Sequence, residues 1–480
     1  MLHRVIVAAL FLLAAGAAPT EQAAPTTLRL DYLHTGNAAE ERFALEGLAL
    51  EGPWPGRPDR PIDDTNLGKY FFEVIDRKTN RVLYSRGFAS IYGEWETTAE
   101  AKELNRGFSE SLRFPMPEGP AQVVLKKRDA RNAFREVWSV LVDPADVSID
   151  RSAWERGRPA RKGAAETAAL PGAWAVMKNG EPRDKVDLLL LGDGYTAAEM
   201  DKWHKDARRV ADTLFSVSPF KERRVDFNVW AVDIPADQSG VTQPQDGIYR
   251  RAPLGAAYGA FGSERYILTF ENRRMREAAM AAPYDVMEIV TNSRKYGGGG
   301  IFNLYATVAA DNAWSPYVLV HEFGHHFAGL ADEYYTSAVA YASSAARPEP
   351  WEPNVTADPL AAKWKGLIPP GTPLPTPWPK EQFEALQKQI QARRRELRAQ
   401  KRPEEEMEAL FKKEQEEIDK LLGSGPHYGI VGSFEGAMYE ARGYYRPQED
   451  CIMFTRSMRF CAVCRRAIER VIDLYSRSDK

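Results

Sequence analysis

Residues 26–145 alternate apolar and polar side chains in several short runs. Side chains two residues apart lie on the same face of a strand, so this period predicts strands that bury one face. Gly, Pro and Asn separate the runs, which lie at 27–32, 69–74, 82–91, 121–126 and 134–142. We therefore expect a small antiparallel β-sandwich domain at residues 26–145, and we find no site chemistry in it.

The hydrophobic pattern changes in the second part of the chain. Residues 146–184 are rich in Arg, Ala, Gly and Pro, a composition typical of a linker. After them come apolar runs of the buried-strand type, at 186–191, 225–234 and 286–291. A helical pattern lies between the first two of these runs. Alternating strands and helices of this kind predict an α/β domain at residues 185–480.

Residues 380–422 are highly charged, but their apolar residues recur at helical spacing. Pro403 divides the segment, with a basic run before it and three glutamates after it, which are the signs that helix dipoles favour. We expect a helical hairpin inserted into the second domain. We favour a solvated structural arm over a substrate-recognition arm.

One helical pattern, at residues 315–328, carries the clearest chemistry of the chain. Ser315 and Pro316 suit the start of a helix. His321 and His325 then stand one turn apart on one face, close enough for two imidazoles to bind one zinc ion. Glu322, between them in the HExxH pattern, is placed to take a proton from the attacking water.

A zinc peptidase needs a third protein ligand and an open coordination position. Gly329 can end the helix, and Asp332 follows three residues later. HEFGH, then a glycine, then Ala-Asp-Glu-Tyr resembles the IgA peptidase family of secreted bacterial zinc metallopeptidases. The resemblance implies a metzincin-like catalytic domain in which His321, His325 and Asp332 hold one catalytic Zn²⁺ and Glu322 is the catalytic acid/base.

The same resemblance assigns roles outside the helix. Met453 is the candidate for the methionine turn beneath the metal, and Tyr445 is a candidate for stabilising the oxyanion, with Tyr444 nearly as suitable. A glycine run before the helix is expected to form the rim of the cleft, as an edge strand that pairs with extended substrate. The run consists of Gly297, Gly298, Gly299 and Gly300. A flexible loop is the alternative for this run.

Glu333 and His427 are the competitors of Asp332 for the third ligand position. In an extended segment, Glu333 points to the side opposite Asp332. We therefore expect Glu333 to support the site from behind or to pair with a base, and Asp332 to complete it.

The three cysteines lie together near the C-terminus, at Cys451, Cys461 and Cys464. In an oxidising compartment this set permits one disulfide and one odd thiol. A structural zinc site with four ligands is not expected, because the cysteines are too few and only His427 could join them.

Residues 1–18 have the organisation of a signal peptide. A short charged start precedes an apolar run at 5–15 and small residues at 15–17. We expect a secreted or periplasmic protein with no integral membrane segment after signal removal, because no later run reaches a membrane-spanning length. The charges are nearly balanced, with 64 Lys and Arg against 67 Asp and Glu, which argues against nucleic acid as a partner.

These features predict a secreted zinc-dependent endopeptidase that acts on protein or peptide substrates. Two alternatives stay open: a non-enzymatic surface or binding protein that retains the fold, and a thermolysin-like peptidase with a later glutamate ligand. The intact Glu322 argues against the first, and Asp332 with Met453 argues against the second. The sequence leaves open the physiological substrate, the cutting of IgA, the oligomeric state and a second metal such as calcium.

Overall fold

The computed structural model describes residues 25–152, 172–336 and 347–477. The expected signal peptide and the middle of the expected linker lie outside these residues. Within the described ranges, no helix combines the length and the apolar character needed to cross a membrane.

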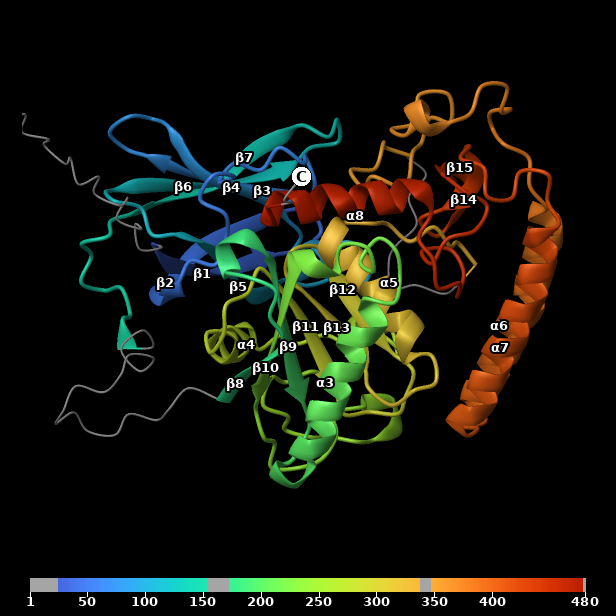
Figure 1. Cartoon of the computed structure of the whole chain (residues 1–480), viewed down its shortest axis with the longest axis horizontal. Helices are drawn as coiled ribbons and strands as arrows, with labels where there is room; N and C mark the ends of the chain where they lie inside the picture. Colours follow the sequence, from blue (N-terminus) through green and yellow to red (C-terminus); the bar gives the residue numbers. More distant parts are fainter. Residues whose placement is uncertain (1–24, 153–171, 337–346, 478–480) are drawn as a thin grey trace, which may run out of the picture.

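The N-terminal domain consists of two antiparallel sheets, as predicted (Figure 1). One sheet has the order β2-β1-β5, with β1 (Thr26–Gly36), β2 (Glu41–Pro53) and β5 (Arg106–Pro115). The other has the order β4-β3-β6-β7, with β3 (Tyr70–Asp76), β4 (Val82–Phe88), β6 (Ala121–Arg128) and β7 (Phe134–Val142). Leu30, Phe72 and Leu125 belong to one buried cluster, so the two sheets share a core.

Two of these strands, β2 and β5, were not among the predicted runs. In β2 the register shifts near Gly47, opposite Asp31 and Tyr32, and such a shift interrupts the alternation that identifies a strand. The short helices α1 (Ile91–Trp95) and η1 (Glu100–Lys102) precede β5.

The second domain is built on a six-stranded sheet of order β12-β13-β11-β9-β10-β8. Its parallel strands are β9 (Val186–Asp193), β10 (Phe227–Asp233), β11 (Val286–Thr291) and β13 (Tyr305–Ala309). Its two edge strands, β8 (Gly172–Met177) and β12 (Gly298–Ile301), run antiparallel to their neighbours. Residues 172–184, expected as linker, therefore contain a strand of this sheet, followed by η2 (Pro182–Asp184).

Helices cover this sheet. α5 (Ser315–Ala328) packs on β12 and β13, and α3 (Met200–Leu214) and α8 (Ala462–Tyr475) pack on α5. α4 (Asn272–Ala279) contacts β5 of the N-terminal domain, where the Asn272 amide donates a hydrogen bond of 2.8 Å to Ser111. The remaining short helices are η3 (Ala197–Glu199), η4 (Arg224–Asp226), η5 (Pro244–Asp246), η6 (Ala260–Gly262) and η7 (Lys365–Leu367).

The predicted hairpin is present as α6 (Lys380–Ala399) and α7 (Glu404–Gly423), at the end of the molecule opposite the N-terminal sheets (Figure 1). It is not a freely solvated arm, because its apolar residues join the core of the second domain. Phe411 lies against Tyr296, and Glu414 forms a buried ion pair of 2.6 Å with Arg456. The chain then forms a small hairpin of β14 (Phe434–Ala437) and β15 (Glu440–Arg446).

His326 fastens α5 to the sheet. Its Nδ1 donates to the carbonyl of Ile301 at 3.0 Å, and its Nε2 accepts from the Met287 N–H at 3.2 Å. Only the neutral ring can do both, and burial lowers the pKa of His326 to about 4.

This buried histidine predicts a loss of stability in mild acid. An unfolded histidine titrates near pH 6.5, so between about pH 6.5 and 4 the unfolded chain binds more protons than the folded one. The free energy of unfolding therefore falls as the pH is lowered through this window. His326→Gln keeps a donor and an acceptor but cannot titrate. We expect the metal-free parent to lose up to about 3 kcal/mol more than this variant between pH 6.5 and 4. Urea unfolding at several pH values measures the difference, and identical pH profiles would contradict it.

Candidate metal centre

His321 and His325 are oriented by backbone carbonyls. The Nδ1 of His321 donates to the carbonyl of Ile452 at 2.9 Å, and the Nδ1 of His325 donates to the carbonyl of Leu330. Each ring thus carries its proton on Nδ1 and leaves the lone pair of Nε2 free. The two Nε2 atoms lie 3.1 Å apart, so both lone pairs point to one place.

Asp332 supplies a third donor at that place. Its Oδ1 lies 3.0 Å from Nε2 of His321 and 3.2 Å from Nε2 of His325. Donor atoms about 2.0–2.1 Å from a tetrahedral zinc ion are about 3.3 Å apart. The three atoms therefore fit one ion of this size, with a fourth position left open.

Asp332 and His325 carry opposite charges, and each shifts the pKa of the other. Burial would raise the pKa of Asp332, but the two histidines hold it well below its ordinary value. Burial would also lower the pKa of His325, but Asp332 and the nearby Glu322 outweigh it and raise this pKa to about 9. The carboxylate of Asp332 thus favours positive charge at this place, which a bound cation would supply.

Gly329 makes the return of the chain to this centre possible. It ends α5 in the left-handed conformation, with φ of 59°. Beyond it, the side chain of Asn354 forms two hydrogen bonds with the backbone of Ala331, at 2.8 and 2.9 Å. These contacts fix the extended segment that carries Asp332.

Tyr439 also holds Asp332, and the sequence did not point to it. Its hydroxyl donates to Oδ2 of Asp332, the oxygen turned away from the histidines. Tyr439 and the preceding Met438 both have positive φ, in the turn between β14 and β15. Neither residue is a glycine, so no sequence signal marked this turn.

Met453, the candidate for the methionine turn, packs against the helix between the two histidines. It is fully buried, and a Cβ added to Gly324, between the two histidines, would lie 3.2 Å from its sulfur. Its carbonyl accepts the N–H of Glu333 at 2.8 Å. The turn at Ile452 and Met453 thus contacts both the helix and the segment that carries Asp332.

Glu322 projects from the same helix and is partly exposed. The fully buried Glu288 of β11 lies near it, and burial followed by the charge of Glu322 raises the pKa of Glu288 well above its ordinary value. Burial thus favours the neutral form of Glu288.

The glycine run contacts the helix directly. A Cβ on Gly300 would lie 2.2 Å from the carbonyl oxygen of Glu322, so only glycine permits this approach. The run forms edge strand β12, but at Gly298 its outer side already pairs with Arg265 and Ile267. The close packing against α5 explains the glycines, and pairing with substrate stays a prediction.

Among the described residues, Tyr445 and Tyr444 make their hydrogen bonds away from the centre. The backbone of Tyr445 pairs with Thr356 in two hydrogen bonds of 2.9 and 3.1 Å. The hydroxyl of Tyr444 donates to the carbonyl of Pro348 at 3.0 Å. Within the β14–β15 hairpin, the tyrosine that contacts the ligand set is Tyr439.

A cavity of about 40 Å³ lies between the centre and the helical hairpin. Tyr317 and Tyr334, which both lie against the ring of His321, form one wall. The other lining residues include Arg265, Arg456 and, from α6, Arg394. The hairpin thus forms part of the surroundings of the centre, and this wall is basic.

A second group of metal-binding residue types lies nearby. Cys451, Cys461 and Cys464 are free thiols, and Glu333 joins them. The expectation that four donors could not assemble here is therefore wrong, because it considered only cysteines and His427. The fourth donor is a carboxylate that lies 131 positions before Cys464.

Two family models match the chain. The model described as IgA Peptidase M64 matches residues 175–472, and the model described as Peptidase M64 N-terminus matches residues 20–139. A comparison with curated proteins found no match.

Removing the carboxylate should empty the centre. In Asp332→Asn the anionic donor is lost while the shape is kept, so we expect the ion to leave at chelator concentrations at which the parent stays loaded. Asp311→Asn, which removes a partly exposed carboxylate paired with Lys202, is the control and should behave like the parent. Metal analysis after graded chelation measures this. Equal retention by Asp332→Asn and the parent would show that Asp332 is not a ligand.

Two tyrosines of the β14–β15 hairpin make a matched pair. Tyr439→Phe removes the hydrogen bond to Asp332, and we expect metal affinity to fall about 10–100-fold. Tyr445→Phe should leave the affinity unchanged. Competition with a chromophoric chelator gives both values, and a reversed order would support Tyr445 over Tyr439.

Proposed function

Because the chain belongs to the IgA peptidase M64 family and is thus a metallopeptidase, we propose that it is a zinc-dependent endopeptidase in which Glu322 is the general base and acid. One observation carries the proposal. The Nε2 atoms of His321 and His325 and the Oδ1 of Asp332 lie within about 3 Å of one another, on and beside the helix that carries Glu322.

The donor set favours zinc. Two imidazoles and one carboxylate suit this ion, whereas calcium and magnesium take oxygen ligands. When bound, zinc would polarise the scissile carbonyl and lower the pKa of water towards about 7. His321, His325 and Asp332 would hold it, and Tyr439 would keep the carboxylate of Asp332 in place.

Glu322 would move the proton. From its position next to His325 it accepts the proton of the attacking water and then gives it to the leaving amine. Its partial exposure leaves it accessible from the open side, and burial favours the neutral form of the nearby Glu288.

Protein or peptide substrates would lie along the outer side of β12 beyond Gly298. The cavity beside Tyr334 would receive a substrate side chain, because Tyr334 and Tyr317 line it and also lie against His321. Secretion or export to the periplasm, based on residues 1–18, is part of the proposal.

Glu322→Gln tests the proposed chemistry. The variant keeps all three donors and the shape of the side chain, so we expect normal metal content and a loss of hydrolysis of about 10²–10⁴-fold. Glu277→Gln, on the exposed face of α4, is the control and should keep full activity. Mass spectrometry of cleaved peptides from a library, together with metal analysis, measures both properties.

Two results would count against the proposal. Full hydrolysis by metal-loaded Glu322→Gln would exclude the role of Glu322. A metal-loaded parent that cleaves no peptide in the library would favour a binding protein that retains the fold.

A further inference from the structure

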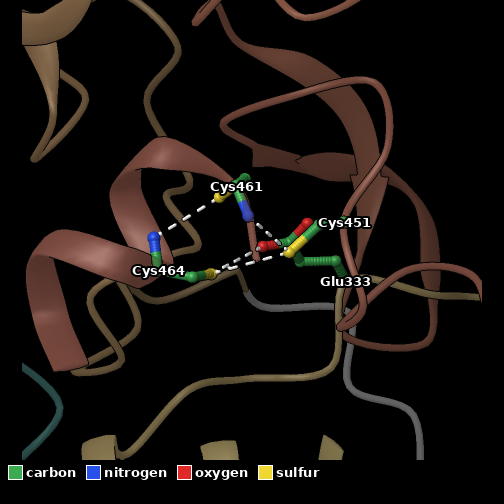
Figure 2. Close-up of side chains that lie close together, drawn as sticks. All are labelled: Glu333, Cys451, Cys461 and Cys464. Atoms are coloured by element: carbon green, nitrogen blue, oxygen red, sulfur yellow. Dashed lines mark hydrogen bonds between the residues drawn. The ribbon is translucent and has the colours of Figure 1, made fainter. Parts of the chain in front are cut away.

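Three cysteines and a glutamate from distant parts of the chain meet in the interior behind the candidate centre. Figure 2 shows the carboxylate of Glu333 and the sulfurs of Cys451 and Cys464 turned towards one another, with Cys461 beside them. One donor atom from each of the four residues lies within 4.8 Å of the other three. All four side chains are buried.

We propose that Cys451, Cys461, Cys464 and Glu333 bind a second metal ion, a zinc-class divalent cation with a structural role. The inference does not rest on peptidase activity. It concerns residues that the proposed hydrolysis does not use.

The distances suit one tetrahedral ion. Sulfurs about 2.3 Å from zinc lie about 3.8 Å apart. The sulfurs of Cys451 and Cys464 are 3.8 Å apart, and the sulfur of Cys464 is 3.4 Å from Oε1 of Glu333. A cluster of several metal ions needs ligands spread more widely than this set.

Backbone N–H groups point at two of the three sulfurs. The sulfur of Cys451 accepts the N–H of Cys461 at 3.3 Å, and the sulfur of Cys461 accepts the N–H of Cys464 at 3.4 Å. Cys461 caps the first turn of α8, where the helix dipole stabilises negative charge.

Glu333 has a buried oxygen without a partner. Its Oε1 accepts from Asn354 at 2.9 Å, but its Oε2 has no hydrogen-bond partner among the described residues although the side chain is fully buried. Such an atom costs free energy unless something binds it. A cation bound by this carboxylate would offset that cost.

A buried cation compensates the charge of the site. Three thiolates and a carboxylate leave two negative charges after a divalent ion binds. Arg446, whose guanidinium is buried against Phe454 and Trp378, interacts favourably with Glu333 and reduces this excess. Soft sulfur donors favour zinc over calcium or magnesium.

Four protein donors leave no open position, which indicates a structural site. The ion would join three segments that also build the first centre. Glu333 follows Asp332, Cys451 precedes the carbonyl of Ile452 that orients His321, and Cys461 and Cys464 open α8, which packs on α5. Its loss should therefore weaken binding at the first centre as well.

Metal analysis and cobalt substitution test the site in the full chain. We expect two metal ions per parent chain and one in Asp332→Asn. With Co²⁺ as the probe, the thiolate-to-cobalt absorption in the near ultraviolet should appear in the parent and persist in Asp332→Asn. It should be absent from Cys461→Ser, because only the second site contains sulfur.

A matched pair of buried glutamates separates ligation from packing. Glu333→Gln should lower metal affinity at the sulfur site at least tenfold. Glu449→Gln should not, because Glu449 lies outside the cluster; it too is buried, and its carboxylate oxygens have no hydrogen-bond partner among the described residues. If Cys461→Ser does not fold, the spectra of the parent and Asp332→Asn still decide the question.

The proposal is overturned if the parent binds one ion only and its cobalt form lacks the thiolate absorption. Mass spectrometry of the purified, metal-free parent gives a second test. The proposal is also overturned if two of the cysteines form a disulfide there and the protein does not bind metal at this site after treatment with a reductant and added metal. Equal affinities of Glu333→Gln and the parent would remove Glu333 from the ligand set.

Discussion

Two backbone carbonyls set the geometry on which the candidate centre depends. The carbonyls of Leu330 and Ile452 hold the Nδ1 protons of His325 and His321, so both Nε2 lone pairs converge. One carbonyl lies just after the helix and the other lies more than a hundred residues later. The centre therefore exists only when the turn that contains Met453 is packed under α5.

After the chain reverses at Gly329, two neighbouring side chains point to two different clusters. Asp332 points to the histidines, and Glu333 points to the cysteines, as successive residues of an extended segment do. The N–H of Glu333 is bound to the carbonyl of Met453, so the reversal and the turn are held together directly. A change in one of the two clusters should therefore alter metal binding at the other.

The helix that carries the histidines is held on several sides. His326 ties it to β11 and β12, and the glycines of β12 let the strand approach within contact of its backbone. The turn with Met453 and α8 hold it elsewhere. Such rigid support suits a site whose donor atoms must stay within a few tenths of an ångström of their positions.

The sequence by itself determined the elements whose signals are local. Spacing placed His321 and His325 on one face of a helix, Gly329 at its end and Asp332 just beyond, and alternation identified five strands of the N-terminal domain. These properties depend on neighbours within a few residues, so they can be read from the chain. The direction of Glu333 away from Asp332 followed from the same local geometry.

Only the tertiary structure decided which distant groups meet. Tyr439 reaches Asp332 through a turn with positive φ at non-glycine residues, and Glu333 reaches Cys464 across 131 positions. β8 was hidden in a segment with the composition of a linker, and the charged surface of α6 and α7 concealed their packing against the second domain. Burial and pairing of this kind depend on contacts between segments far apart in the chain, and no local pattern records them.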